Sequence, residues 1–353
     1  MAGDNGAAGR ARPRAYLTRA LPEEARQVVA AACDLAEWNS ESSPVPRDEL
    51  LRAVHDADGV LTLLTDRVDE QFLDAAPKCR VVANMAVGYD NVDLEALTRR
   101  GVLLTNTPDV LTETTADLVW ALTLAAARRI VEGSDAIRAN AWGAWSPMFL
   151  TGYDVYGSTL GLVGAGRIGA AVARRAHGFG MTLRYHNRNR VPALEAETGA
   201  EYRSFEHLLR ESDFIVCLVP LTEQTCGLFG AAEFAMMKPT AVFVNAARGA
   251  VVREADLVDA LRRGRPWAAG LDVFEREPIG ADHPLAALPN ATIVPHLGSA
   301  TVRTRTAMAT LAARNLVAAL TGGKPPNPVN RAANQAAQTS EGSKSRWPPT
   351  RQT

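Results

Sequence analysis

Two predicted strands end at side chains that could perform acid–base chemistry. Arg248 follows the apolar run 241–245 in a loop of small residues, where a guanidinium can bind a carboxylate through two hydrogen bonds. His296 follows the predicted strand 292–294, and a protonated imidazole can donate a proton to a carbonyl oxygen. Open parallel sheets bind ligands at the carboxyl ends of their strands, so we expect Arg248 and His296 to face one site. A cation for a carboxylate and an acid for a ketone oxygen are two of the three things that reduction of a 2-oxo acid needs, and the third is a hydride.

A third predicted strand, 267–273, leads into a loop with two glutamates, Glu275 and Glu277. A carboxylate beside an imidazole stabilises the imidazolium and orients its ring. Either glutamate could serve His296 in this way, and the spacing alone does not separate them. Asp272, at the end of the same strand, could accept a hydrogen bond from a carboxamide. The other five histidines are expected to have surface or packing roles: His55, His177, His186, His207 and His283.

A glycine-rich segment predicts a dinucleotide-binding turn. Gly164, Gly166 and Gly169 form the pattern G-x-G-x-x-G between a predicted strand at 159–163 and a helix that begins at Arg167. In this motif the first glycine permits a tight turn, the second lets a pyrophosphate approach the backbone, and the third lets helix and strand pack closely. The N-terminus of the helix then presents N–H groups to the pyrophosphate.

The strand after this motif predicts which dinucleotide is preferred. An NAD site normally carries Asp or Glu about 20 residues further on, where it binds the ribose 2′-hydroxyl. The segment 181–190 contains no acidic residue, and Arg188 and Arg190 instead offer guanidinium groups to a 2′-phosphate. We therefore predict a preference for NADP(H), with NAD(H) also accepted. The alternative is that both arginines are solvated surface residues in an arginine-rich chain.

Alternating strand and helix patterns predict two parallel α/β domains. A helix is expected over 112–129, after a bend at Pro108, and another over about 301–320. The predicted fold is a Rossmann dinucleotide-binding domain inserted into a flavodoxin-like substrate domain. The expected segments are 14–108 and 297–330 for the substrate domain, 109–296 for the dinucleotide-binding domain, and 1–13 and 331–353 as a disordered leader and tail.

Composition excludes several other classes of protein. The chain has 353 residues and a formal net charge of −1, so no overall basic field favours nucleic acid or an anionic membrane. The sequence lacks a signal peptide and any apolar stretch of about 18 residues, which predicts a cytoplasmic protein without a membrane partner. The cysteines form no Cys-x-x-Cys pair, so neither a metal site nor a disulfide framework is expected: Cys33, Cys79, Cys217 and Cys226.

Several motifs taken together resemble the D-isomer-specific 2-hydroxyacid dehydrogenase family, and within it the glyoxylate/hydroxypyruvate reductase branch. The resemblance covers residues from Arg14 to about Arg331, and its motifs lie at 84–91, 115–117, 164–169, 219–222, 245–249, 272–278 and 295–298. It implies a catalytic set of Arg248, Glu277 and His296. It also favours Glu277 over Glu275, because the family's glutamate directly precedes a proline.

The resemblance further implies binding residues and a dimer. Backbone N–H groups of Val87 and Gly88, together with Arg248, are expected to bind the substrate carboxylate. The dimer is expected to form through an arm at about 140–156. The implied cofactor-binding residues, with Asp272 at the nicotinamide, are Thr115, Gly164, Gly166, Arg167, Ile168, Gly169, Asn187, Arg188, Val219, Pro220, Thr225, Ala246, Asp272 and Gly298. The apolar residues of the arm, which could alternatively belong to a core, are Trp142, Trp145, Met148 and Phe149.

The expected activity is the NAD(P)H-dependent reduction of glyoxylate or hydroxypyruvate to the D-2-hydroxy acid. The nicotinamide supplies hydride and His296 supplies the proton. One alternative is a reductase of 2-ketogluconate or another 2-oxo acid with the same catalytic set. Another alternative, of a different class, is a dinucleotide-sensing corepressor or scaffold. The presence of all three catalytic side chains argues against that alternative. The missing acid after the glycine motif departs from the pattern of NAD-dependent members.

Overall fold

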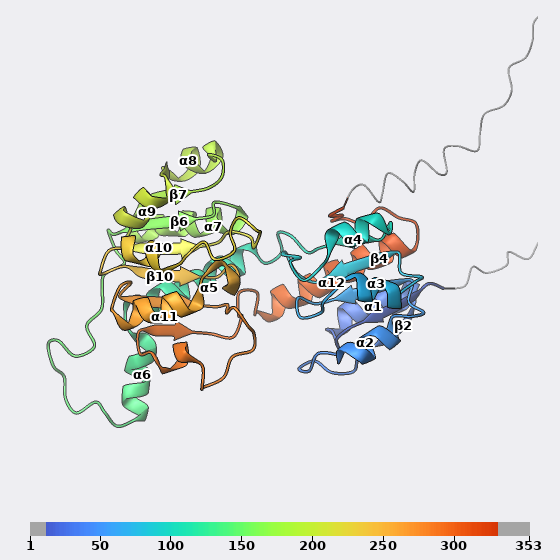
Figure 1. Cartoon of the computed structure of the whole chain (residues 1–353), viewed down its shortest axis with the longest axis horizontal. Coiled ribbons are helices and arrows are strands. Elements are labelled where there is room, and N and C mark those ends of the chain that lie inside the picture. The colour runs from blue at the N-terminus through green and yellow to red at the C-terminus, as the bar shows by residue number, and fades with distance from the viewer. Residues whose placement is uncertain (1–11, 331–353) are drawn as a thin grey trace, which may run out of the picture. The chain divides into compact units, whose positions relative to one another are not determined.

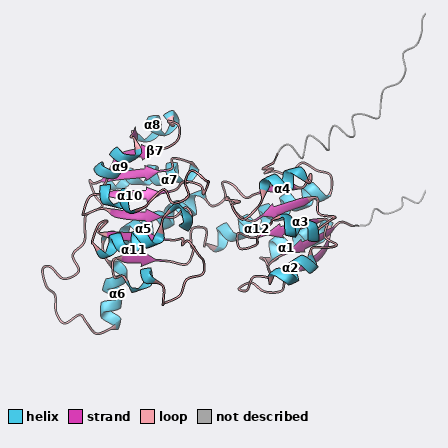
Figure 2. Cartoon of the chain, in the orientation of Figure 1, coloured by secondary structure: helices cyan, strands magenta, loops and turns pink. Residues whose placement is uncertain are grey.

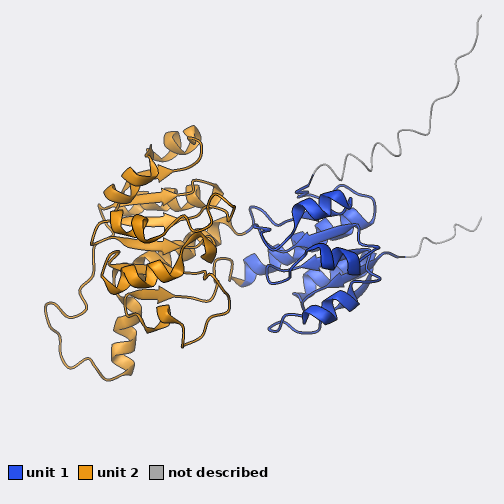
Figure 3. Ribbon diagram, in the orientation of Figure 1, with its two compact units in different colours: residues 1–110, 302–353 blue, residues 111–301 orange. Residues whose placement is uncertain are grey.

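Parallel strands alternate with helices along the chain and form two separate sheets (Figures 1 and 2). The computed structural model describes residues 12–330. These residues form two units: unit 1 comprises 12–110 and 302–330, and unit 2 comprises 111–301 (Figure 3). Each unit is an α/β layer structure, so the predicted fold class is confirmed. Within the described residues, no helix is long and apolar enough to span a membrane.

Unit 1 has a parallel sheet whose described strands follow the order β2-β1-β3-β4-β5. The strands are β1 (Arg14–Leu17), β2 (Asp34–Glu37), β3 (Gly59–Thr62), β4 (Val81–Asn84) and β5 (Leu103–Thr105). The helices are α1 (Glu23–Ala32), α2 (Arg47–Ala53), α3 (Glu70–Ala75), α4 (Leu94–Arg99) and α12 (Val302–Leu320). Helix α12 follows unit 2 in the sequence but belongs to unit 1, where it packs on α1 and on β3, β4 and β5. Buried Asn315 of this helix accepts the N–H of Asn327 at 2.9 Å, which ties the following segment to unit 1.

Unit 2 has a larger parallel sheet, and its described strands follow the order β12-β11-β10-β9-β6-β7-β8. The strands are β6 (Thr159–Val163), β7 (Thr182–His186), β8 (Glu201–Tyr202), β9 (Phe214–Cys217), β10 (Val242–Asn245), β11 (Ala268–Leu271) and β12 (Ala291–Ile293). The helices are α5 (Thr112–Ala127), α6 (Ile130–Arg138), α7 (Arg167–Ala176), α8 (Pro192–Thr198), α9 (Phe205–Glu211), α10 (Ala231–Met236) and α11 (Glu254–Arg262). The strand order reverses between β6 and β9, where doubly wound sheets bind dinucleotides.

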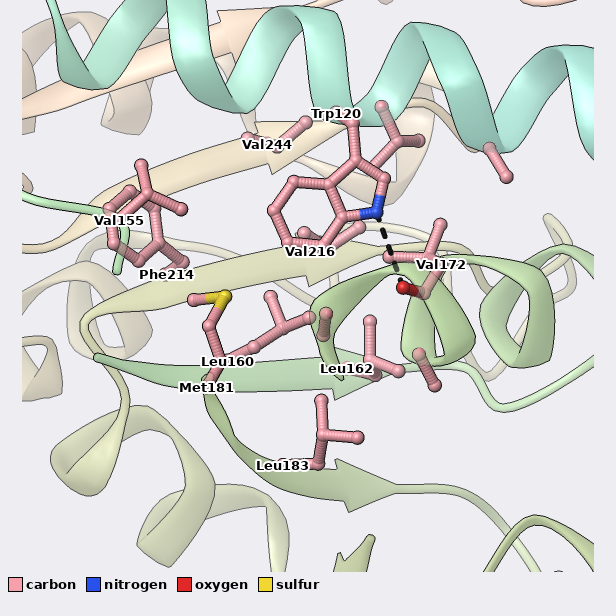
Figure 4. Packing of buried hydrophobic residues seen from close by; sticks show 14 of the residues in the cluster. Trp120, Val155, Leu160, Leu162, Val172, Met181, Leu183, Phe214, Val216 and Val244 are labelled. Atoms are coloured by element: carbon pink, nitrogen blue, oxygen red, sulfur yellow. Dashed lines mark hydrogen bonds between the residues drawn. The ribbon is translucent and has the colours of Figure 1, made fainter. Parts of the chain in front are cut away.

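Both faces of the unit 2 sheet are buried, because its strands alternate side chains between two apolar clusters. On β10, Val242 and Val244 point to the cluster under α5 and α7, and Phe243 points to the cluster under α10 and α11. Trp120 of α5 fills the first cluster, and its indole N–H donates to the carbonyl of Val172 at 3.2 Å (Figure 4). Its ring stacks on Phe179 with the centroids 4.7 Å apart. Strands buried on both faces account for the continuous apolar runs in the sequence.

Several boundaries differ from the sequence-based expectations. The chain returns to unit 1 after Thr301 and not after His296, because Leu297 and Gly298 donate backbone hydrogen bonds to Asp272 of unit 2. The predicted leader 1–13 lies outside the described residues up to residue 11, as does the tail 331–353. Arg12 is not part of a disordered leader, since its guanidinium donates to the carbonyl of Cys33 at 2.9 Å.

The helix predicted over 112–129 is confirmed as α5, and a second helix that the sequence analysis did not predict, α6, begins at Ile130. Helix α5 ends at Ala127, and Arg129 adopts a left-handed conformation with φ of 52° that starts α6 in a new direction. The arm that follows is exposed, so the alternative that its apolar residues belong to a core is wrong. The side chains at Trp145 and Met148 are 81% and 74% exposed, and those at Trp142 and Phe149 are also exposed.

Candidate active site

The loops after β11 and β12 bring a carboxylate and an imidazole together. Glu277 Oε2 lies 2.8 Å from Nδ1 of His296. A carboxylate can only accept, so Nδ1 carries a hydrogen and Nε2 is the ring nitrogen that can exchange a proton with a ligand. The second oxygen, Oε1, accepts the N–H of Phe274 at 3.0 Å, which fixes the plane of the carboxylate.

The charge state of Glu277 follows from these contacts. Burial raises the pKa of Glu277, but the hydrogen bond and charge of His296, the N–H of Phe274 and the charge of Arg248 together bring it below its ordinary value. The side chain is 31% exposed and remains an anion at neutral pH. An anion at this position accepts the hydrogen of Nδ1 and orients the imidazole ring.

Asp272 holds the turn that carries His296. Its carboxylate is buried at the end of β11, where Oδ1 accepts the N–H of Leu297 at 2.5 Å and Oδ2 accepts the N–H of Gly298 at 3.0 Å. Burial raises the pKa of Asp272, and the two N–H groups and the charge of His296 only partly offset this. The turn is tight, since His296 has φ of 52°. The hydroxyl of Thr115 donates to the carbonyl of Gly298 at 3.0 Å, which also holds the residues that follow His296 in place.

Arg248 lies in the turn after β10, at the carboxyl ends of the strands, as do the loops after β11 and β12. Asn245 Nδ2 donates to the Arg248 carbonyl at 3.1 Å, and the guanidinium donates to the carbonyl of Ala247 at 2.9 Å. Gly249 then passes against the loop after β11, because a Cβ at this position would lie 1.8 Å from the carbonyl carbon of Phe274. The turn with Arg248 and the loop with Glu277 are therefore in direct backbone contact, and the charge of Arg248 acts on Glu277.

The structure separates the two glutamates that the sequence leaves open. Glu275 Oε1 accepts the N–H of Glu254 at 2.8 Å, and the N–H of Glu275 donates to the Glu254 carboxylate at 3.2 Å. Glu275 is thus engaged with the start of α11, and Glu277 is the glutamate that contacts His296. Glu254 also lies 2.9 Å from Nε2 of His283 through its Oε1. Neither residue has a sequence pattern that indicates this contact.

Each glycine of the G-x-G-x-x-G motif has the environment its predicted role requires. Gly164 has φ of 102°, and a Cβ there would lie 2.7 Å from the carbonyl carbon of Leu218. A Cβ on Gly169 would lie 2.4 Å from the carbonyl oxygen of Gly164, so helix α7 packs closely on the turn. Within the described residues, a Cβ on Gly166 would meet no atom within 4 Å, which leaves room for a pyrophosphate beside the backbone. These residues fit a dinucleotide.

Other predicted cofactor residues surround this turn. Ala246 follows β10 and donates its N–H to Cys217, the last residue of β9. Val219 and Pro220 come after β9, and the carbonyl of Pro220 accepts the hydroxyl of Thr225 at 2.6 Å. These bonds close the loop at the carboxyl end of β9, beside the point where the strand order reverses.

The two arginines after β7 differ in their contacts. Arg190 is bound by both oxygens of Glu195, at 3.0 and 2.7 Å, and Glu195 also accepts the hydroxyl of Tyr185. Arg188 is exposed, and among residues 12–330 it has no hydrogen-bond or ion-pair partner. Asn187 lies beside it and donates to the carbonyl of Asn189 at 3.2 Å. The two arginines therefore differ in that Arg190 is engaged by a carboxylate of its own unit and Arg188 is not.

Val87 and Gly88 lie in the loop after β4 of unit 1. Their carbonyls accept hydrogen bonds from Asn106 Nδ2 at 2.9 Å and Asn84 Nδ2 at 3.2 Å. Within the described part of the chain, the N–H groups of Val87 and Gly88 have no acceptor. Two adjacent backbone N–H groups that have no acceptor within the protein are suited to bind an anion.

The doubly wound sheet of unit 2 and its glycine motif are those of a dinucleotide-binding protein. Residues 120–298 match the family model described as D-isomer specific 2-hydroxyacid dehydrogenase, NAD binding domain. The chain belongs to this family, and the resemblance seen in its motifs is confirmed.

Relatives with curated names and solved structures agree with this assignment. The chain is 49% identical over 324 residues to a glyoxylate reductase of Thermococcus kodakarensis, covering 91% of this chain and 97% of that one. A Thermus thermophilus protein of known structure has a TM-score of 0.83 and 46% identity, with 90% of this chain and 99% of that chain covered. An NADPH-dependent glyoxylate/hydroxypyruvate reductase from Sinorhizobium meliloti, solved with NADP and malonate, has a TM-score of 0.78 and 33% identity, with 92% and 98% covered.

Proposed function

We propose that this protein reduces glyoxylate to glycolate, or hydroxypyruvate to the corresponding D-2-hydroxy acid. The observation that carries the proposal is the 2.8 Å contact between Glu277 and His296, at the sheet edge where the glycine motif and Arg248 also lie. The relatives named glyoxylate reductase or glyoxylate/hydroxypyruvate reductase support the choice of substrate.

The proposed mechanism assigns one task to each group. The glycine motif would hold a reduced nicotinamide dinucleotide, which would supply the hydride for the carbonyl carbon of the substrate. The guanidinium of Arg248 binds the substrate carboxylate. Nε2 of His296 donates a proton to the carbonyl oxygen, which becomes the hydroxyl of the product. Glu277 stabilises the imidazolium before this transfer, and the ring is neutral afterwards.

Steady-state kinetics with glyoxylate, hydroxypyruvate, pyruvate and 2-ketogluconate test the substrate class. We expect the highest kcat/KM for glyoxylate or hydroxypyruvate with NADPH as the reductant. A clear preference for 2-ketogluconate or pyruvate would assign the catalytic set to another 2-oxo acid. If the protein bound the dinucleotide but turned over none of the four acids, a corepressor or scaffold role would replace the proposal.

The coenzyme preference is proposed to be for NADP(H), through Arg188. This guanidinium has no partner among the described residues, and no acidic side chain follows the glycine motif at 181–190 to compete with a phosphate. Arg188→Ala should lower kcat/KM for NADPH by roughly 10- to 150-fold, since charge-assisted hydrogen bonds contribute about 1.5–3 kcal/mol. The kcat/KM for NADH should stay nearly unchanged. Arg210→Ala, which removes an arginine from the last turn of α9, is the matched control. Equal losses with NADPH and NADH would exclude Arg188 as a 2′-phosphate ligand.

We also propose a homodimer that buries the exposed arm at 140–156. Several large apolar side chains on this arm and on α6 face solvent in the single chain, which is unusual for a stable monomer. Sedimentation of the wild-type protein should give twice the chain mass of 37.8 kDa. The double substitution Trp145→Ser with Met148→Ser should weaken that association, and a wild-type protein that sediments as a monomer would refute it.

A further inference from the structure

The loop that carries Glu277 has no regular secondary structure of its own. After Phe274 the chain runs through an irregular, largely exposed segment until the short 3₁₀ turn Pro284–Ala287. Glu277 lies near the start of this segment, and its two hydrogen bonds run to Phe274 and His296. A catalytic carboxylate in such a loop needs further contacts to keep its position.

One carboxylate joins the two ends of this loop. Glu254, the first residue of α11, accepts the N–H of Glu275 through Oε2 at 3.2 Å. Its other oxygen, Oε1, lies 2.9 Å from Nε2 of His283. Glu254 therefore holds residue 275 at one end and residue 283 at the other, with Glu277 between them.

The environment of Glu254 suits this role. Its side chain and that of His283 are only 17% and 19% exposed. The N–H of Leu285 donates to Nδ1 of His283 at 3.3 Å, so Nε2 carries the hydrogen and donates to Glu254. The nearby carboxylate of Glu275 accepts the N–H of Glu254 at the start of α11, where the helix dipole favours negative charge.

We propose that Glu254 is a positioning residue that closes the 275–283 loop and thereby fixes Glu277 against His296. The inference rests on the proposed roles of Glu277 and His296 and adds a residue that does not touch substrate or cofactor. It explains why a glutamate at the start of α11 and a histidine 29 positions further on share a mostly buried contact. His283 assists by holding the far end of the loop.

Glu254→Ala tests the proposal, with Asp259→Ala on the exposed face of the same helix as the matched control. We expect kcat for 2-oxo acid reduction to fall between about 10- and 100-fold in Glu254→Ala, the range caused by displacing a catalytic group by about 1 Å. The Kd for NADPH should not change, because the glycine motif lies on β6 and α7. Asp259→Ala should behave as the wild type.

A double-mutant cycle shows whether Glu254 acts through Glu277. In a Glu277→Gln background the catalytic carboxylate is already gone, so adding Glu254→Ala should lower kcat by less than about twofold. An equal fold loss in both backgrounds would show that Glu254 acts independently of Glu277, and would overturn the proposal. Should Glu254→Ala fail to fold, His283→Ala releases only one end of the loop and should give a smaller loss in the same direction.

Amide hydrogen exchange gives a readout that does not depend on turnover. Exchange in the 275–283 segment should accelerate in Glu254→Ala and stay unchanged in Asp259→Ala. If amide exchange in the 275–283 segment were the same in Glu254→Ala as in the wild type, the proposed positioning role of Glu254 would be overturned, whatever the activity of the variant. A different outcome is that the wild-type protein reduces no 2-oxo acid while exchange in the loop still accelerates in Glu254→Ala. That result would refute the proposed function but would still support the role of Glu254 in closing the loop.

Discussion

A single methyl group at residue 249 should disconnect the two parts of the catalytic site. A Cβ on Gly249 would lie 1.8 Å from the carbonyl carbon and 1.9 Å from the carbonyl oxygen of Phe274. Carbon atoms in contact prefer separations of about 3.5–4.0 Å, so the two backbones must move apart by more than about 1 Å. The obstacle is backbone, which cannot rotate away as a side chain does. Gly249→Ala would therefore move the Arg248 turn away from the loop that holds Glu277.

The expected size of the effect follows from this overlap. Overpacking costs about 1–3 kcal/mol, and we expect the upper end because main chain blocks the methyl group. About 3 kcal/mol corresponds to a fall of roughly 6–12 °C in the unfolding temperature of a unit of this size. A displacement of about 1 Å between catalytic groups costs about 10²-fold in rate, so kcat/KM for the 2-oxo acid should fall by at least that factor.

Thermal unfolding and steady-state kinetics of Gly249→Ala measure both effects. Gly178→Ala is the matched control, since within the described residues a Cβ there meets no atom within 4 Å. A Gly249→Ala protein with wild-type unfolding temperature and kcat/KM would refute the close backbone contact and the argument built on it.

Three further predictions concern titration, the His296 turn and thiol reactivity. The pKa of Glu277 is lowered in the folded protein, so its stabilising effect is present above the ordinary value of 4.5 and is lost as pH falls through the lower folded value. The difference in unfolding temperature between wild type and Glu277→Gln should therefore shrink between pH 5 and pH 3; a constant difference would contradict the shift. Asp272→Asn replaces one acceptor oxygen by an amide that faces an N–H, so kcat should fall at least tenfold, and an unchanged kcat would remove Asp272 from the support of His296. Burial raises the pKa of Cys79 and Cys217 to about 12, whereas Cys226 is exposed, so a thiol reagent should modify Cys226 first in the native protein; modification of Cys79 or Cys217 at a similar rate would contradict their burial.

The sequence was most informative where a local motif determines the backbone. The glycines at 164, 166 and 169 could be interpreted from spacing alone, since their roles depend on neighbours within one turn. Buried strands were also predictable, because apolar runs on both faces leave little alternative to a covered parallel sheet. Short edge strands such as β2 and β8 have exposed or half-buried side chains and lack that signal.

Contacts between distant residues were not predictable from the sequence. Glu254 and His283 meet only because α11 and the loop after β11 fold against each other, so neither residue has a local pattern that indicates the pair. The two glutamates at 275 and 277 have the same spacing relative to the strand, and only their partners in the fold distinguish them. Arg190 likewise looks equivalent to Arg188 until its ion pair with Glu195 is seen.

The account depends most on His296 as the proton donor, and single-turnover kinetics of His296→Asn test this directly. Enzyme saturated with NADPH and mixed with glyoxylate would be followed by the loss of reduced-nicotinamide absorbance. The account predicts that the rate of this step falls by about 10²–10⁴-fold while NADPH still binds, which is the usual effect of removing a general acid. A rate within twofold of the wild type would contradict the central claim.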